Sequence, residues 1–291
     1  MITRTAKASS GLLSQAADLI VENGTYLKET FPQCSNKTEV QSELKRSPEE
    51  WNLLFTDQLA ALFTLHLSDT EAAIGKFLPS PSLPFDSLVP SLQQDLKRMK
   101  IGLLTLHVPE EMSESLVKNG FEKRRILVKL QGPTVETKLM PILPLNSPKP
   151  RDLPILAKLM YDSYEKGSEP KLSSVASAER LLSGIMNGIH GPYAAEASLT
   201  SGATQNIVSA CFITLPSPTE AHVAQLYTHP LYRARGLATT EVATGMNKLV
   251  KRGVQTLTVW LGEDNEIAGR LFAKLGFKLQ QKLVEMVSRI Q

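Results

Sequence analysis

The spacing of hydrophobic residues in the second half of the chain predicts alternating helices and strands. Apolar residues recur at helical spacing through residues 153–164, and more weakly through residues 177–187. The elements predicted after these two helices are strands at 193–199, 207–215 and 221–228, a helix at 236–252, a strand at 257–261, a helix at 265–275 and a strand at 278–290. This order predicts an α/β layered fold, with helices packed against a mixed sheet.

The first half of the chain repeats this order in a weaker form. Its predicted elements are strands at 53–55, 59–67 and 72–77, a helix at 87–99, a strand at 101–107 and a strand at 125–130. The segment Leu116-Val117-Lys118-Asn119-Gly120-Phe121-Glu122 also resembles Phe272-Ala273-Lys274-Leu275-Gly276-Phe277-Lys278. In both segments a glycine is placed to end a helix just before a strand. We therefore predict that the two halves arose by duplication of one fold.

A stretch rich in proline separates the two halves. Prolines accumulate between Gln131 and Pro154, together with Gly132. Proline lacks a backbone N–H and ends helices, so this composition favours a linker followed by a short edge strand. We predict one domain at residues 1–132 and a second at residues 139–291.

Composition and charge exclude several classes of protein. The chain has 291 residues, 42% of them hydrophobic, which is enough to form two packed cores. A net charge of +3 is too small to indicate a nucleic-acid or membrane surface. The start of the sequence lacks the apolar segment of a secretion signal, and no run approaches the ~18 apolar residues of a membrane span. We expect a cytoplasmic protein that binds neither nucleic acid nor membranes.

The two cysteines indicate neither a metal site nor a disulfide. Cys34 and Cys211 are far apart and lack both Cys-x-x-Cys spacing and nearby histidine pairs. Cys211 lies in an apolar run and is predicted to be a buried thiol.

One strand–loop–helix segment has the chemistry of an anion site. The strand ending at Thr228 continues into His229-Pro230-Leu231-Tyr232-Arg233-Ala234-Arg235-Gly236-Leu237-Ala238-Thr239, which opens a helix. A helix N-terminus offers unpaired N–H groups and the positive end of the helix dipole, which suit a phosphate. Gly236 and Ala238 leave the backbone accessible, and Arg233 and Arg235 add positive charge. In isolation, so short a pattern would more often be an ordinary surface loop with solvated arginines.

This segment resembles the signature [Gln/Arg]-x-x-Gly-x-[Gly/Ala] of the GNAT N-acetyltransferase superfamily. The flanking Leu-Tyr-Thr-His-Pro-x-Tyr, and the downstream Asn265-x-x-Ala268-x-x-Leu271-Phe272-x-Lys274-Leu275-Gly276-Phe277, match the family in order and spacing. The resemblance covers residues 139–291 and is strongest over residues 222–277. It implies a GNAT acetyltransferase domain in the second half and a degenerate GNAT-like domain in the first. The implied fold is tandem, each domain having a mostly antiparallel sheet flanked by helices.

The resemblance also implies a cofactor, acetyl-CoA or another acyl-CoA. The backbone of Leu226, Tyr227 and Thr228 would hold the pantetheine arm, and the loop N–H groups would surround the pyrophosphate. A backbone N–H at the end of this strand would polarise the thioester carbonyl. The implied cofactor-binding residues are Leu226, Tyr227, Thr228, Arg233, Ala234, Arg235, Gly236, Leu237, Ala238, Thr239, Asn265 and Phe272.

Transfer to an amine requires a base, because a lysine-type amine with a pKa of ~10.4 is charged at pH 7. His222 is the leading candidate, since its strand position resembles that of the catalytic glutamate in the histone-acetyltransferase branch. The alternative is a surface histidine without a role. Lesser candidates are Tyr193, Glu196, Glu220 and Glu263. His229 is expected to shape the turn before the loop, and Trp260 argues against a ribosomal-protein acetyltransferase.

The sequence departs from the family pattern at three places. Ala234 stands where many members have glycine, and Phe272 stands where many have the tyrosine that protonates the leaving thiolate. In the first half, the corresponding loop at residues 77–84 is rich in proline and lacks glycine. We therefore expect one active site per chain.

The expected function is transfer of an acetyl group from acetyl-CoA to a primary amine by direct attack in a ternary complex. The alternatives are a non-catalytic acyl-CoA-binding or interaction module, and an enzyme similar to glycine N-acyltransferases that uses a longer acyl-CoA. The acceptor would be a small-molecule or peptide amine, bound by residues 162–174 and 191–197. Within these segments Tyr164, Glu165 and Glu169 could attract a cation, although acidic residues at a helix edge are usually just solvated.

Overall fold

The computed structural model divides the chain into two compact units. It describes residues 2–4, 10–22, 34–46, 51–55, 59–67, 71–79, 85–164, 172–188, 191–203 and 205–290. Unit 1 consists of Met1–Leu127 and Lys282–Gln291, and unit 2 consists of Val128–Gln281. Each unit is a mostly antiparallel sheet flanked by helices, so the predicted fold class is confirmed.

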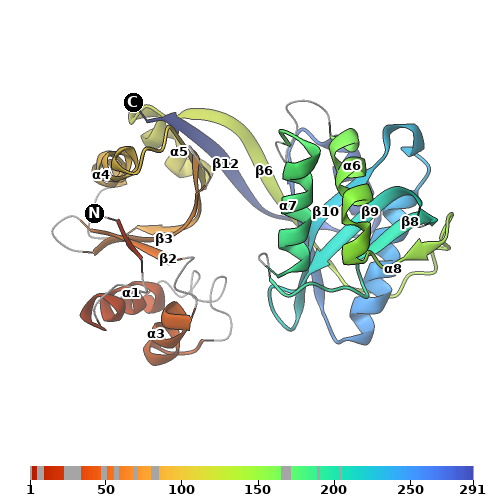
Figure 1. Cartoon of the computed structure of the whole chain (residues 1–291). Helices are drawn as coiled ribbons and strands as arrows, with labels where there is room; N and C mark the ends of the chain where they lie inside the picture. The colour runs from red at the N-terminus through yellow and green to blue at the C-terminus, as the bar shows by residue number, and fades with distance from the viewer. Residues whose placement is uncertain are drawn as a thin grey trace. The chain divides into compact units, whose positions relative to one another are not determined.

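Unit 2 has helices on both faces of its strands. Its helices are α6 (Leu153–Ser163), α7 (Val175–Met186), α8 (Leu237–Lys251) and α9 (Glu266–Lys274), with short 3-10 turns η2 (Pro150–Asp152) and η3 (Pro230–Tyr232). Its strands are β7 (Leu145–Asn146), β8 (Leu199–Ala203), β9 (Asn206–Thr214), β10 (Glu220–Thr228) and β11 (Thr256–Gly262), joined by the second part of β6 (Glu122–Pro133). Figure 1 shows α6 and α7 side by side over one face.

The two faces of the unit 2 sheet carry separate cores. One core joins α8 to β9, β10 and β11 through residues such as Met246, Ile213 and Leu257. The other joins α6 and α7 to the opposite face, where Phe212 and Tyr227 are buried. Both faces of β9 and β10 are therefore covered, which fixes the strands that lead to the predicted site.

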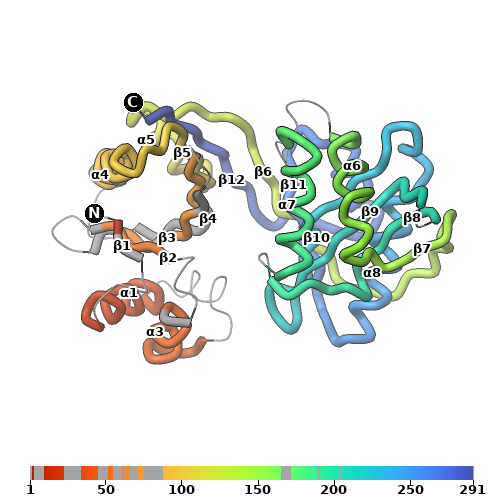
Figure 2. Tube along the Cα trace, in the orientation of Figure 1, coloured from red at the N-terminus to blue at the C-terminus, as the bar shows by residue number. Residues whose placement is uncertain are grey.

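Unit 1 is assembled from the start and the end of the chain. Its helices are α1 (Ser10–Glu22), α3 (Lys37–Arg46), α4 (Phe85–Arg98) and α5 (Glu110–Lys118), and its strands are β1 (Ile2–Arg4), β2 (Trp51–Phe55), β3 (Leu59–Leu67), β4 (Glu71–Pro79), β5 (Leu103–Val108) and most of β12 (Lys278–Arg289). β12 pairs antiparallel with β5, from Val284 opposite Val108 to Arg289 opposite Leu103. Figure 2 traces these two strands next to each other.

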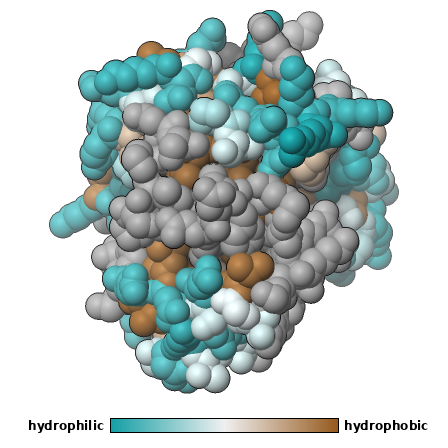
Figure 3. Space-filling view, turned by 90° about the vertical axis from the view of Figure 1, so that its left-hand side faces the viewer, coloured by the Kyte–Doolittle hydropathy of each residue, from teal (hydrophilic) through white to brown (hydrophobic). Residues whose placement is uncertain are grey.

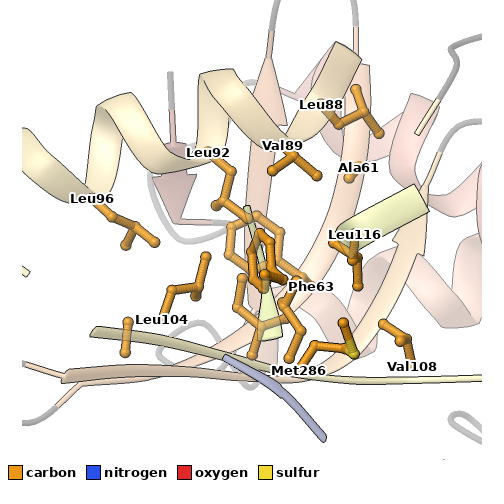
Figure 4. Close-up of a cluster of buried hydrophobic side chains, with 14 of the residues drawn as sticks. Ala61, Phe63, Leu88, Val89, Leu92, Leu96, Leu104, Val108, Leu116 and Met286 are labelled. Carbon is orange, nitrogen blue, oxygen red and sulfur yellow. The ribbon is translucent and has the colours of Figure 1, made fainter. Parts of the chain in front are cut away.

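The main core of unit 1 contains residues from distant parts of the sequence. Figure 4 shows Leu88, Leu92 and Leu96 of α4 above Phe63 of β3, with Met286 of β12 on the opposite side of that ring. Phe63 and Met286 are fully buried. The last strand of the chain thus completes the core of the unit that the first residues begin.

The two units repeat one feature of strand pairing, as the predicted duplication requires. In unit 2, Glu220–Val223 of β10 pair in parallel with Thr256–Val259 of β11. In unit 1, Glu71–Ile74 of β4 pair in parallel with Leu103–Leu106 of β5. In both pairs the strands continue past the paired stretch.

Two sequence predictions need correction. The predicted domain limits at residues 132 and 139 differ from the compact units, which divide after Leu127 and assign the last residues to unit 1. The reason is that β6 and β12 each contribute to both units, and a strand's hydrophobic pattern does not identify its partner. The functional labels attached to the two predicted domains stay predictions.

The second correction concerns the strand predicted at residues 193–199. Tyr193 makes only an isolated bridge to Thr214, and a turn follows in which Ala197 and Ser198 donate to the carbonyl of Ala194. The strand begins instead at Leu199 and continues through small and polar residues to Ala203. Hydroxyls on this strand are buried against α8, a tertiary contact that local hydrophobicity does not reveal.

On the side of the molecule drawn in Figure 3, the described residues are mostly hydrophilic, and the hydrophobic ones appear as separate spots. Within the described part of the chain, no helix combines the length and the apolar composition that crossing a membrane requires.

Candidate functional site

The strands β10 and β11 separate at the point where the predicted site begins. Their parallel pairing ends at Val223 and Val259, while β10 continues to Thr228 and β11 to Gly262. A bulge between Val223 and Gln225 shifts the register of β10 against β9 at the same place. Bulges re-aim a strand and end pairing next to active sites. The backbone of residues 226–228 stays paired with β9 along one edge and extends beyond the paired part of β11 along the other.

The loop after β10 turns sharply into α8. Gly236 is the N-cap of α8 with φ of +80°, and Ala234 also has a positive φ, of +59°. The positive φ of Gly236 favours glycine, and a Cβ added there would also come within 3.1 Å of Cδ1 of Ile142. The exposed residues 233–236 lead into α8, whose first backbone N–H groups, at residues 237–239, have no carbonyl partner within the helix, as an anion site requires.

The two loop arginines are hydrogen-bonded to nearby carbonyls. Arg233 donates from Nη2 to the carbonyl of Ser163, at 2.5 Å, and from Nε to that of Thr228, at 3.4 Å. Arg235 donates to the carbonyl of Leu231, at 3.1 Å, and its guanidinium lies 5.0 Å from the centroid of the Tyr232 ring. From the sequence, these two arginines were predicted to add positive charge to the loop. The contacts show in addition that Arg233 joins the end of β10 to the end of α6.

His222 lies on β10 next to polar groups of β11. Its Nδ1 is 3.1 Å from Oγ1 of Thr258, its partner in the parallel register. Oγ1 of Thr258 is in turn 3.1 Å from the carbonyl oxygen of Ala221 and 3.3 Å from Oε1 of Glu220. Lys129 is 3.6 Å from the same Glu220 oxygen. The leading candidate base is therefore held on one side by a hydroxyl, which is connected to a carboxylate.

The lesser candidates have other surroundings. Glu196 forms an ion pair with Arg252, and both side chains are about half exposed. Burial raises the pKa of Tyr193 to about 12, which keeps its hydroxyl protonated. Glu263 is exposed. Nδ1 of His229 accepts from the backbone N–H of Leu231, so this histidine does shape the turn.

Asn265 and Phe272 have structural roles. Oδ1 of Asn265 accepts from the backbone N–H of Ala268 and caps α9. Phe272 is 1% exposed and packs in the core with its ring centroid 5.0 Å from that of Phe277. This burial argues against the predicted contact between the Phe272 side chain and a cofactor, because the ring fills the core.

The end of α6 and β10 share a partly buried polar pair. The hydroxyl of Tyr164, at the end of α6, donates to Oε1 of Gln225 at 2.9 Å, and burial raises the tyrosine pKa. Gln225 follows the bulge that lies beyond His222. Glu165 and Glu169, which the sequence suggested as cation-attracting groups, lie outside the described residues.

Sequence reasoning missed a buried glutamate on the helix that follows the loop. Glu241 is on the first turns of α8, has no exposed surface, and accepts hydrogen bonds from Ser201 and Ser209 at 2.6 and 3.0 Å. Burial raises its pKa to about 8. A signal was present in the sequence, because Glu241 interrupts the buried stripe of Leu237, Gly245 and Leu249 at helical spacing.

Unit 1 has the same strand geometry without the same side chains. Ala73 pairs with Thr105 as His222 pairs with Thr258, so an alanine stands at the position of the candidate base. The loop predicted at residues 77–84 is described only as far as Pro79, the last residue of β4.

A separating pair of parallel strands, a bulge, and a glycine turn at a helix N-terminus together define the acyltransferase fold of the GNAT type. In agreement, residues 193–277 match the model of the acetyltransferase (GNAT) family. No curated protein matches the sequence.

Solved structures extend the similarity of fold to the whole chain. A GCN5-related N-acetyltransferase from Sphaerobacter thermophilus is 14% identical with a TM-score of 0.71, and the match covers 100% of this chain and 96% of that one. A tandem GNAT protein from the clavulanic acid biosynthesis pathway is 12% identical with a TM-score of 0.67, covering 100% and 98%. A Drosophila protein is 13% identical with a TM-score of 0.58, covering 97% of both chains. The chain therefore has a tandem GNAT fold, as predicted.

Proposed function

We propose that unit 2 transfers an acetyl group from acetyl-CoA to a primary amine, by direct attack of the amine in a ternary complex. The observation that carries this proposal is the separation of β10 from β11 where β10 leads into the Gly236 turn. A GNAT fold supports acyl transfer in general, and the residues around this separation supply the parts of a specific reaction. Unit 1 has alanine in place of His222, which supports one active site per chain.

The backbone of β10 and the loop would bind the cofactor. Leu226, Tyr227 and Thr228 offer peptide groups to the pantetheine arm in the manner of a neighbouring strand. The N–H groups from Ala234 to Thr239 belong to the loop and the first turn of α8, where the helix dipole favours a pyrophosphate. Acetyl-CoA supplies the thioester carbonyl that the amine attacks, and an N–H near the end of β10 would stabilise the developing oxyanion.

His222 is the proposed general base, and its neighbours select its tautomer. The Thr258 hydroxyl has one proton and two nearby acceptors, the carbonyl of Ala221 and the carboxylate of Glu220. When Thr258 donates to either, it accepts from Nδ1–H of His222, which leaves the lone pair on Nε2. A histidine held in this tautomer can take a proton from the amine through Nε2.

The departing thiolate needs no acid from the core. Phe272 cannot supply a proton, and it is buried. A thiol pKa of ~8.5 allows the thiolate to leave unprotonated or to be protonated by water.

Calorimetry with acetyl-CoA tests the first requirement of this function. Binding with a dissociation constant below about 1 mM is expected from the loop geometry. Absence of heat at millimolar acetyl-CoA would refute the proposal. Competition between acetyl-CoA and longer acyl-CoA donors would then define the acyl chain, which distinguishes an acetyltransferase from an enzyme similar to glycine N-acyltransferases.

Substitution of His222 tests the base. His222→Ala should lower kcat by about 100-fold or more while leaving the acetyl-CoA dissociation constant unchanged, because only proton transfer is lost. Thr258→Val, which keeps the shape but removes the hydroxyl, should reduce kcat less and alter the 15N shifts of the His222 ring. Thr256→Val on the same strand serves as the matched control. Unchanged turnover in His222→Ala would reject this histidine as the base.

Phenylalanine at position 272, where many family members have the proton-donating tyrosine, favours one alternative, a non-catalytic acyl-CoA-binding module. Such a module would bind acetyl-CoA yet release no free thiol against any amine in a panel. Measuring thiol release with and without amines, in the same samples used for calorimetry, separates the two functions.

A further inference from the structure

Glu241 is a carboxyl enclosed between α8 and three strands of unit 2. Oε1 accepts from the Ser201 hydroxyl of β8 at 2.6 Å, and Oε2 accepts from the Ser209 hydroxyl of β9 at 3.0 Å. Oγ of Ser209 is also 2.8 Å from Oγ1 of Thr228, the last residue of β10. We call Ser201, Ser209, Thr228 and Glu241 the Glu241 network. It connects the first turns of α8 to the end of the strand proposed to hold pantetheine.

Ser209 is the branching point of this network. Its hydroxyl carries one proton but lies near three acceptors, the carboxylate of Glu241, Oγ1 of Thr228 and, at 3.2 Å, the carbonyl of Tyr227. When Glu241 is ionised, the Ser209 proton is directed to the carboxylate, since hydrogen bonds to charged acceptors are the stronger ones. When Glu241 is protonated, its own proton can be donated to Ser209. The Ser209 proton then bonds to Tyr227 or Thr228 of β10.

The surroundings of Glu241 favour the protonated form. Burial outweighs the hydrogen bonds from Ser201 and Ser209 and raises the pKa of Glu241 to about 8. The other titratable groups that face it are Cys211 of β9 and Tyr227 of β10, and because burial raises both of their pKa values, both stay uncharged.

Stability does not explain why a glutamate occupies this buried position. A buried group that ionises costs free energy relative to a neutral side chain of the same shape. Residues that depart from the expected pattern, such as an ionisable side chain at a core position, are most often found at functional sites. Here the carboxyl lies in the second turn of the helix that Gly236 caps, and Ser209 connects it to the end of β10.

We propose that Glu241 is a positioning residue for acyl-CoA, and that loss of its proton weakens acyl-CoA binding by redirecting Ser209 away from Tyr227 and Thr228. The inference rests on the proposed function, since it assumes that this part of β10 binds pantetheine. It adds a residue outside the loop signature and a dependence on pH that the loop alone would not produce.

The test is calorimetry with acetyl-CoA at pH 7 and pH 9, using the full chain. Over this range the cofactor phosphates, with a second pKa near 6, stay ionised, and the thioester carries no thiol proton. If only protein with protonated Glu241 binds fully, affinity should fall by up to about tenfold at pH 9. Glu241→Gln, whose amide can donate to Ser209 at any pH, should change by less than about twofold.

Two serine variants separate the network from general effects of buried hydroxyls. Ser209→Ala removes the connection to β10, so binding should be weaker at both pH values and lose the alkaline fall. Ser198→Ala is the matched control, because the Ser198 hydroxyl is also buried in this unit but bonds to the backbone of Ile213. It should keep the alkaline fall of the wild type. Thermal unfolding at each pH establishes that every variant is folded.

The outcomes distinguish this inference from the proposed function. An equal fall in affinity for wild type and Glu241→Gln would overturn the role of Glu241 and leave the proposed function standing. Absence of acetyl-CoA binding by the wild type at both pH values would overturn the proposed function itself.

Discussion

Ala234 adopts a backbone conformation that is unusual for a residue with a side chain. Its φ of +59° lies in the left-handed region, where a Cβ approaches the following carbonyl oxygen. Gly236, two residues later, has a similar φ of +80° and no Cβ to strain. The loop therefore stores strain at one of the two positions that need this conformation.

Ala234→Gly should stabilise the protein by up to about 1 kcal/mol, because relief of left-handed strain exceeds the added entropy of the unfolded chain. Urea unfolding followed by circular dichroism measures the change. Gly236→Ala is the reciprocal control and should destabilise by about 1–2 kcal/mol, since it adds strain and a contact with Ile142. A loss of stability in Ala234→Gly would contradict this interpretation of the loop.

At the residue scale, the sequence predicted the loop better than its surroundings. Gly236 and the helix start at Leu237 follow from local chemistry, and the structure has both. The carbonyl partners of Arg233 and the burial of Glu241 depend on α6, β8 and β9, which are distant in sequence. Tertiary neighbours of this kind leave only weak signals in one sequence.

Glu285 of β12 shows how one strand is held in unit 1. Its buried carboxylate contacts Nε2 of His107 on β5 at 3.2 Å, and Nη2 of Arg125 and Nη1 of Arg124 on β6 at 2.9 and 3.1 Å. Burial alone would raise its pKa, but the bond with His107 and the charges of the arginines lower it to about 2. A single side chain thus connects β12 to both of its neighbours.

Glu285→Gln should destabilise the protein by about 2 kcal/mol at pH 7, because two partly buried arginines lose their counter-charge. The pKa in the folded state lies below the ordinary value of 4.5. This stabilisation is therefore complete above pH 4.5 and is lost as the pH falls toward 2. Urea unfolding at pH 7 and pH 3 should show a smaller difference between the two pH values for the variant than for the wild type.

An exposed pair provides the control for Glu285. Glu266 and Arg270 form an ion pair one turn apart on α9, with both side chains more than two-thirds exposed. Glu266→Gln should change stability by no more than about 0.5 kcal/mol. Equal effects of the two substitutions would mean that the buried Glu285 cluster contributes no more to the free energy of unfolding than an exposed ion pair does.

At the element scale, periodicity identified most helices and strands of unit 2 but not their partners. The predicted strand at residues 221–228 corresponds to β10 (Glu220–Thr228), and the predicted helix at 236–252 to α8. The strand pattern at residues 278–290 was also correct, yet nothing in it indicates pairing with β5. Edge and partner choice come from the assembled sheet, which explains why the predicted domain limit needed correction.

At the scale of the whole molecule, the stability of unit 1 depends on residues from the end of the chain. Met286→Ala should destabilise unit 1 by about 2–5 kcal/mol, because it opens a cavity next to Phe63 in a closely packed core. Hydrogen exchange measured by mass spectrometry should show reduced protection of β5, while β9 in unit 2 keeps its protection.

Leu279→Ala is the matched control on the same strand, since Leu279 is 54% exposed and belongs to the part of β12 in unit 2. It should leave exchange in both units nearly unchanged. Equal loss of protection in β5 and β9 of Met286→Ala would show that the two units unfold as one.

The assignment of Lys282–Gln291 to unit 1 has a consequence for synthesis on the ribosome. All of Val128–Gln281 is translated between the two parts of unit 1, which takes about 8–30 s at 5–20 residues per second. Unit 2 can fold during this interval. The apolar edge of β5 stays unpaired until Val284 and Met286 of β12 have been synthesised. The first unit to leave the ribosome is thus the last to be completed. A premature stop before residue 282 would leave that edge exposed to chaperones and proteases.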